Sequence, residues 1–166
     1  RGMSTNTKVL LVKKETPNIQ SLAKASFSSV GAEDYLRSLT QKMLVDSKQP
    51  DISQTISFTA VPKEMDALMN LSFGLIKACI VSQDTITQFA QISAKQFSTL
   101  KFLARSKPIL NPLVMVSSAS SDSTKQLGNS FKSLFASAEG KKAMSYLGLE
   151  GWRDLNDNER TLLKGE

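Results

Sequence analysis

Short apolar runs alternate with segments of helical periodicity over the first half of the chain. The apolar runs at 8–14, 24–29, 55–61 and 75–82 have the length and the flanking turn or charged residues typical of strands. The segments between these runs predict two helices. The first spans 31–47 and has Tyr35, Leu36, Leu39 and Met43 on one face, and the second spans 63–73 and is preceded by Pro62. This order predicts an α/β fold with a mostly parallel sheet flanked by helices, because parallel strands need crossover connections.

The second half continues the sheet and then becomes helical. Apolar runs at 100–105 and 112–116 predict two further strands, separated by a break that contains Pro108. The serine-rich segment 117–123 predicts a loop that ends in a helix N-cap, at Ser121 or Asp122. Beyond it, one helical face carries Leu127, Phe131, Leu134 and Phe135. We therefore expect a disordered tag or tail at 1–7, an α/β lobe at 8–116 and a C-terminal helical segment at 117–166.

Composition and charge limit the classes of function that this chain can have, but they do not identify one. The 166 residues include 40% hydrophobic residues, which is enough for one packed core, and no apolar run approaches the length of a membrane span. The net charge of +6 favours anionic partners, but the lysines are spread along the chain and Trp152 is isolated, so a nucleic-acid interface is not expected.

Histidine is absent and Cys79 is the only cysteine. An internal disulfide, a zinc site of the usual ligands and a Ser-His or Cys-His nucleophile are therefore excluded. Cys79 lies within an apolar strand pattern, where burial is expected. We expect no metal, no cofactor and no enzymatic activity.

Several segments together resemble the phosphate, phosphite and phosphonate solute-binding proteins of ABC transporters, which have the type II periplasmic-binding fold. The first strand and the segment after it are "KVLLVKKETPNIQSLAKASF", and the serine-rich turn that opens a helix is "SSVGAEDYL". The glycine-containing stretch between a helix and a strand is "ALMNLSFGLIKACIVS". The proline-interrupted pair of runs is "LARSKPILNPLVMV", and the C-terminal ending is "EGKKAMSYLGLEGW". The resemblance covers about residues 8–158, and "LARSKPILNPLVMV" is the most specific match.

The resemblance implies the solute-binding component, or a partial lobe of one, of an uptake system for a small phosphorus oxyanion such as phosphate or phosphonate. Its partners would be a small anionic ligand and the membrane subunit of an ABC transporter, in the periplasm or another extracytoplasmic space, although this chain contains no secretion signal. The expected ligand-binding residues surround two helix starts: Ser28, Ser29, Gly31, Thr59 and Lys63. From the residues alone, Ser29 as a plain helix cap is the competing interpretation, because the first turn carries Glu33 and Asp34.

The chain also departs from the family pattern. Met65 stands near the place of a family histidine, and Lys77 stands near the place of an acidic residue. By comparison with the family, this sequence is expected to lack the first part of lobe one, and thus to be either a fragment or a naturally short protein. The alternative function is therefore a shortened, non-transport interaction or sensor domain that has lost ligand binding.

Two structural questions stay open at this point. Pro108 and Pro112 predict either a hinge between two lobes or an ordinary rigid turn. An exposed strand edge at 112–116 and the apolar helical face that begins at Leu127 predict a homodimer, unless the C-terminal helices fold back onto the sheet and leave a monomer.

Overall fold

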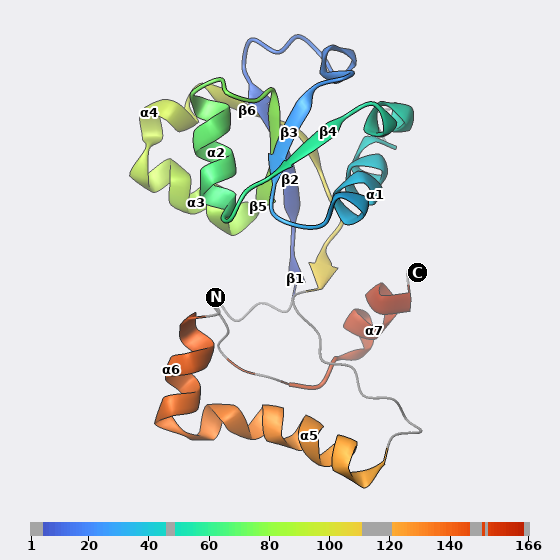
Figure 1. The fold of residues 1–166 in the computed structure, drawn as a ribbon, viewed down its shortest axis with the longest axis vertical. Coiled ribbons are helices and arrows are strands. Elements are labelled where there is room, and N and C mark those ends of the chain that lie inside the picture. The colour runs from blue at the N-terminus through green and yellow to red at the C-terminus, as the bar shows by residue number, and fades with distance from the viewer. Residues whose placement is uncertain (1–4, 46–48, 111–120, 147–150, 152, 165–166) are drawn as a thin grey trace. The chain divides into compact units, whose positions relative to one another are not determined.

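The computed structural model describes the chain except for residues 1–4, 46–48, 111–120, 147–150, 152 and 165–166. It divides into two compact units (Figure 1). One unit comprises Asn6–Ile109, and the other comprises Arg1–Thr5 together with Leu110–Glu166. The predicted strand at 112–116 and Pro112 lie outside the described residues.

The larger unit is built on a five-stranded sheet with the order β4-β3-β5-β2-β6. β3 pairs in parallel with both β4 and β5, whereas β2 is antiparallel to its neighbours β5 and β6. The predicted α/β fold is therefore confirmed, and one central strand runs against the other four. The strands are β2 Lys8–Lys13, β3 Ser26–Ser29, β4 Ser57–Ala60, β5 Ala78–Ser82 and β6 Leu100–Arg105.

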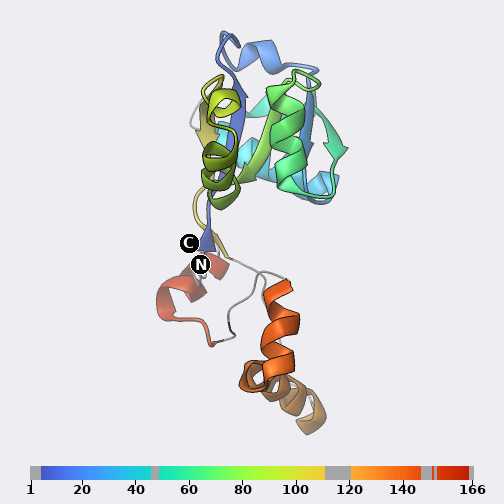
Figure 2. The same cartoon turned by 90° about the vertical axis from the view of Figure 1, so that its left-hand side faces the viewer.

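Helices cover both faces of this sheet. Figures 1 and 2 show α1 on one face and α2 and α3 on the other. The expected helices at 31–47 and 63–73 correspond to α1 and α2, and the helices that follow β5 were not expected from the sequence. The helices are α1 Glu33–Leu44, α2 Glu64–Ser72, α3 Gln83–Ile92 and α4 Ala94–Phe97, with 3-10 turns η1 Gln20–Leu22 and η2 Pro50–Gln54.

The apolar run in β2 is unbroken because both faces of this strand are buried. Leu10 and Val12 pack in the cluster beneath α1, and Val9 and Leu11 pack in the cluster beneath α2 and α3. All four side chains are fully buried, as is typical of a central strand with helices on both sides. Cys79 is also fully buried, as expected, and burial raises the pKa of its thiol, so it is not a reactive cysteine.

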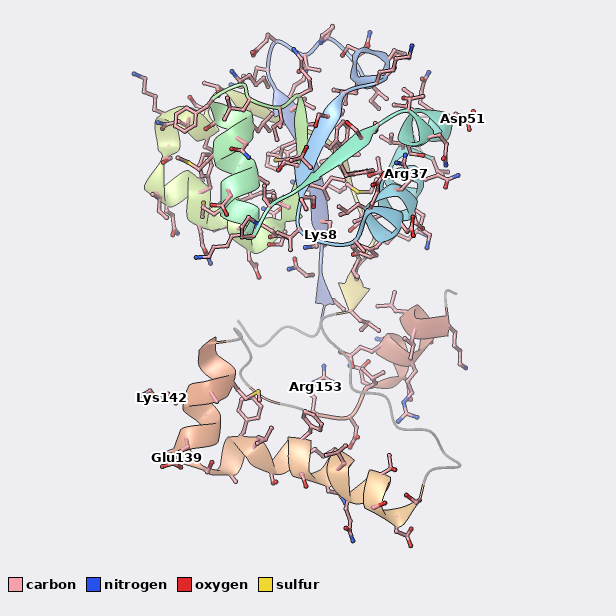
Figure 3. The ribbon with its side chains drawn as sticks, in the orientation of Figure 1. Lys8, Arg37, Asp51, Glu139, Lys142 and Arg153 are labelled. Atoms are coloured by element: carbon pink, nitrogen blue, oxygen red, sulfur yellow. The ribbon has the colours of Figure 1, made fainter. Side chains whose placement is uncertain are left out.

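Arg37 connects α1 to the segment that leads into β4 (Figure 3). Its guanidinium donates to the carbonyl oxygens of Ser53 at 2.6 Å and Ile56 at 3.2 Å, and to Glu33 Oε1 at 2.5 Å. The same group lies 5.5 Å from the centroid of the Phe58 ring.

Replacing Arg37 with alanine should therefore lower the free energy of unfolding by about 1.5–2 kcal/mol, since it removes charge-assisted bonds to two backbone carbonyls. Urea denaturation measures this change, and Lys42→Ala on the exposed side of α1 is the control. Equal stability of the two variants would contradict the role assigned to Arg37.

The smaller unit is helical where it is described. It contains α5 Asp122–Ser133, the 3-10 turn η3 Leu134–Ala136, α6 Ala138–Tyr146 and α7 Asp157–Lys164. Ser121 is the N-cap of α5, one of the two expected positions. At the start of α7, Glu159 accepts from the amide of Asn156 and Asn156 Oδ1 accepts from the amide of Glu159, which is a capping box.

The face expected to support a homodimer is only partly exposed in this unit. Leu127 is 57% exposed, whereas Phe131, Leu134 and Phe135 are half-buried. Self-association of the chain stays a prediction.

Two short strands lie where the chain passes from one unit to the other. β1 Thr5–Asn6, placed in the terminal tail by the sequence, pairs with β7 Ile109–Leu110 in a two-stranded sheet. Pro108 directly precedes β7. The hinge and the ordinary rigid turn both remain untested predictions for this proline.

Candidate ligand-binding site

The carboxyl ends of three parallel strands meet at one edge of the sheet. Ser29 of β3 is in register with Ala60 of β4 and with Ile80 of β5, so these strands end close together. Each strand leads into a helix, α1, α2 or α3. Open α/β sheets bind ligands outside the carboxyl ends of their strands, where helix starts present backbone N–H groups. This edge is the candidate site.

Ser28 and Ser29 belong to β3 and are both buried. Successive residues of a strand point to opposite faces, so these two side chains cannot converge on one ligand. Ser29 Oγ donates to the carbonyl of Ile80 at 2.8 Å, and Ser28 Oγ donates to the carbonyl of Thr59 at 3.4 Å. The interpretation of Ser29 as the cap of the following helix is therefore wrong, because its hydroxyl joins two strands.

The remaining predicted residues are exposed at or near this edge. Gly31 forms the turn between β3 and α1 with φ of +136°, a conformation that residues with a side chain rarely adopt. Thr59 lies in β4, where its hydroxyl is 3.1 Å from that of Ser26, and Lys63 directly precedes α2. The structure thus leaves Gly31, Thr59 and Lys63 accessible and buries the two serines.

The starts of α1 and α2 lack a side-chain cap. The N-cap residues are Ala32 and Lys63, neither of which has a side-chain acceptor for the first N–H groups of the helix. The start of α3 differs, because Ser82 Oγ accepts from the amide of Thr85 at 3.3 Å. Two of the three helix starts at this edge therefore still offer N–H groups to an external acceptor.

The sequence analysis missed a polar cluster centred on Glu64, the first residue of α2. Its carboxylate is paired with Lys8 Nζ and accepts hydrogen bonds from the Ser82 amide at 2.9 Å, the Ser82 hydroxyl at 2.5 Å and the Thr85 hydroxyl at 2.7 Å. Lys8 lies at the same edge of the sheet, at the base of β2 (Figure 3). The cluster joins β2, α2 and the start of α3.

The pKa of Glu64 reflects two opposing effects. Burial by itself would raise the pKa, but hydrogen bonds from Lys8, Ser82 and Thr85 outweigh burial and lower the pKa below its ordinary value. The carboxylate therefore stays ionised at neutral pH and neutralises Lys8.

Other charges of both signs lie at this edge, including Asp66 in the first turn of α2 and Arg105 at the end of β6. Glu33 is paired with Arg37, while Asp34 and Lys63 are exposed. No metal-binding group of three or more Asp, Glu, Cys or His side chains occurs among the described residues. In that same part of the chain, every helix is too short or too polar to cross a membrane.

The sequence model of one protein family matches residues 1–159. The family is described as the phosphonate periplasmic substrate-binding protein of ABC transporters. A search of curated proteins found no match.

Two solved structures with low sequence identity illustrate the similarity of the fold. XAC2383 from Xanthomonas citri, solved bound to ATP, has a TM-score of 0.70 at 13% identity, with 99% of this chain and 65% of that chain covered. A binding protein component of an ABC phosphonate transporter, PA3383 from Pseudomonas aeruginosa, has a TM-score of 0.60 at 14% identity, with 98% and 57% covered. The chain thus spans less than two thirds of the length of these proteins.

Proposed function

Because the chain belongs to the family of periplasmic substrate-binding proteins of phosphonate ABC transporters, we propose that it binds a small phosphorus oxyanion, such as phosphate or a phosphonate. In this proposal it is the solute-binding component of an uptake system, or part of one, and the site is the edge where β3, β4 and β5 end. The membrane subunit of the transporter is its partner, and the protein works outside the cytoplasm.

The observation that carries the proposal is the pair of uncapped helix starts. The oxygens of a phosphoryl or phosphonyl group accept hydrogen bonds from several N–H groups at once, and the positive end of a helix dipole stabilises their negative charge. The first turns of α1 and α2 provide such groups beyond the carboxyl ends of two adjacent parallel strands, β3 and β4, from the two faces of the sheet. The exposed Gly31 lets a ligand approach the backbone closely.

Charge supports an anion at this edge only modestly. Lys63 is exposed at the start of α2 and can add one charge-assisted hydrogen bond. Lys8 contributes little, because Glu64 neutralises it. Asp34, in the first turn of α1, opposes an anion. Backbone N–H groups therefore provide most of the proposed recognition.

Two residues depart from the family pattern, Met65 and Lys77, and neither contributes a polar contact to a ligand at the proposed site. Met65 packs against the apolar cluster beneath α2 and α3, so it provides no polar ligand contact. Lys77 precedes β5 and thus lies at the opposite edge of the sheet. A ligand at the proposed site must be held without either residue.

Titration with methylphosphonate, followed by amide chemical shifts of the whole chain, tests the proposal. We expect saturable shifts at Gly31, Glu33 and Lys63. Replacing Lys63 with alanine should weaken binding by about three- to tenfold, the effect of one exposed charge-assisted hydrogen bond.

The matched control is Lys95→Ala, which removes one exposed positive charge from α4. It should leave the affinity unchanged if Lys63 acts locally and not through net charge. The proposed site is disproved if Gly31 and Lys63 show no saturable shift with methylphosphonate or inorganic phosphate.

A further inference from the structure

A cavity of about 300 Å³ lies in the larger unit at the other edge of the sheet. β2 ends and β5 begins at this edge, because Val12 is paired with Ala78 in antiparallel register. The segment after β2 and the loop between α2 and β5 form its walls, and Lys13 and Lys77 contribute positive charges from the two sides. The cavity is therefore distinct from the proposed phosphonate site.

The positive charge around this cavity is poorly neutralised. Lys13 Nζ lies 4.0 Å from Glu15 Oε1, at the outer limit of an ion pair, and the Glu15 side chain is 72% exposed. Such a pair contributes little in water. The Lys77 side chain has no hydrogen bond or ion pair with any residue in the described ranges. An anion in the cavity would contact two ammonium groups without competing for a strong partner, and these two charges outnumber the single opposing carboxylate of Glu15 in the lining.

Gly74 keeps the ammonium of Lys13 at the cavity wall. A Cβ at this position would lie 3.1 Å from Lys13 Nζ, and the backbone has φ of +78°. A residue with a side chain would be strained there by the positive φ, and the Lys13 ammonium would have to move by a few tenths of an ångström. The lack of a side chain at Gly74 thus leaves room for the Lys13 ammonium at this wall.

The rest of the cavity is held in place and is partly apolar. Lys101 Nζ of β6 donates to the carbonyl of Thr16, which fixes the wall after β2 and adds a third ammonium group nearby. Leu22 is buried and Ile76 is half-buried where they line the cavity. A ligand with both an anionic group and a small apolar body matches this lining.

We propose that this cavity binds a small organic oxyanion, with its phosphonate or carboxylate group between Lys13 and Lys77 and its apolar body against Leu22 and Ile76. The volume sets the size of the ligand, since about 300 Å³ is at the lower end of small-molecule sites. The proposal does not depend on the function of the opposite edge.

Amide chemical shifts of the whole chain, recorded with phenylphosphonate, benzoate and inorganic phosphate, provide the test. We expect saturable shifts at Gly74, Ile76 and Lys77 with the two aromatic anions. Inorganic phosphate should bind about tenfold more weakly than phenylphosphonate, because it lacks a body to bury against the apolar lining.

Two variants test the charges and one tests the geometry. Lys13→Ala and Lys77→Ala should each weaken phenylphosphonate binding by about tenfold, whereas Lys95→Ala should not change it. Gly74→Ala keeps every charge and should still weaken binding, because it strains the loop at positive φ and shifts the Lys13 ammonium by a few tenths of an ångström. Lys77 is exposed, so its replacement leaves the fold intact and keeps the test informative even if Gly74→Ala unfolds the protein.

The outcomes separate the two sites. The absence of saturable shifts at Gly74, Ile76 and Lys77 up to about 10 mM ligand would overturn the proposal. Equal affinities of Lys77→Ala and Lys95→Ala would overturn it as well. Shifts confined to Gly31 and Lys63 would support the phosphonate site and reject this cavity, and shifts confined to the cavity would do the reverse.

Discussion

Replacing Phe27 with alanine should lower the free energy of unfolding by about 3–5 kcal/mol. Phe27 is fully buried in β3, the strand between β4 and β5, and its ring packs edge-on against Phe58 with centroids 6.0 Å apart. Truncation would leave a cavity beneath α1 that the rigid sheet cannot fill. Urea denaturation monitored by circular dichroism measures the loss.

Phe73→Ala is the matched control for this prediction, because it makes the same chemical change at a side chain that is 62% exposed. We expect it to change the free energy of unfolding by less than about 0.5 kcal/mol. A loss at Phe27 no greater than the loss at Phe73 would contradict the assignment of Phe27 to the core.

Replacing Glu64 with alanine should lower the free energy of unfolding by about 3 kcal/mol at neutral pH. The Glu64 side chain is only 15% exposed, and removal of its carboxylate leaves Lys8 without its ion-pair partner and three donors of Ser82 and Thr85 without their acceptor. Glu64→Gln keeps an acceptor of similar shape and should lie between the wild type and the alanine variant.

The effect of Glu64 should also depend on pH in a defined direction. Its pKa is lowered in the folded protein, so its carboxylate stabilises the fold above the ordinary glutamate pKa of about 4.3. This stabilisation is lost as the pH falls through the lower folded-state pKa. The difference in unfolding free energy between wild type and Glu64→Ala should therefore shrink in acid. A difference that stays constant from neutral to acidic pH would show that the carboxylate charge is not responsible.

The sequence predicts β2 well because the burial of this strand is reflected directly in its composition. Val9–Val12 form an unbroken apolar run since both faces of β2 are covered. α3 was missed for the opposite reason, because its sequence is mostly polar and only Ile86 and Phe89 are buried. The one local signal for this helix was Ser82, a good N-cap residue, which the sequence pattern assigned to the end of the preceding strand.

The candidate site could be predicted only in part. Gly31 and Lys63 lie at loop-to-helix junctions, which the turn residues and the change of hydrophobic period locate well in a sequence. The adjacent serines of β3 belong both to the predicted strand 24–29 and to the serine-rich turn of the family pattern, and the structure shows that they are buried within a paired strand. The pair of Lys8 and Glu64 joins residues 56 positions apart, a contact that no local pattern contains.

The position of β2 also bears on the order in which the chain can fold. β2 is the first strand of the five-stranded sheet in sequence, yet it lies between β5 and β6, so both of its neighbours are synthesised much later. Pairings between such distant segments require large loops to close and slow the folding of a domain. In a chain that is synthesised from its N-terminus, β2 therefore has two open edges until Ser82 has followed and one open edge until Arg105 has followed. Over that interval the apolar strand is exposed to chaperones and to aggregation.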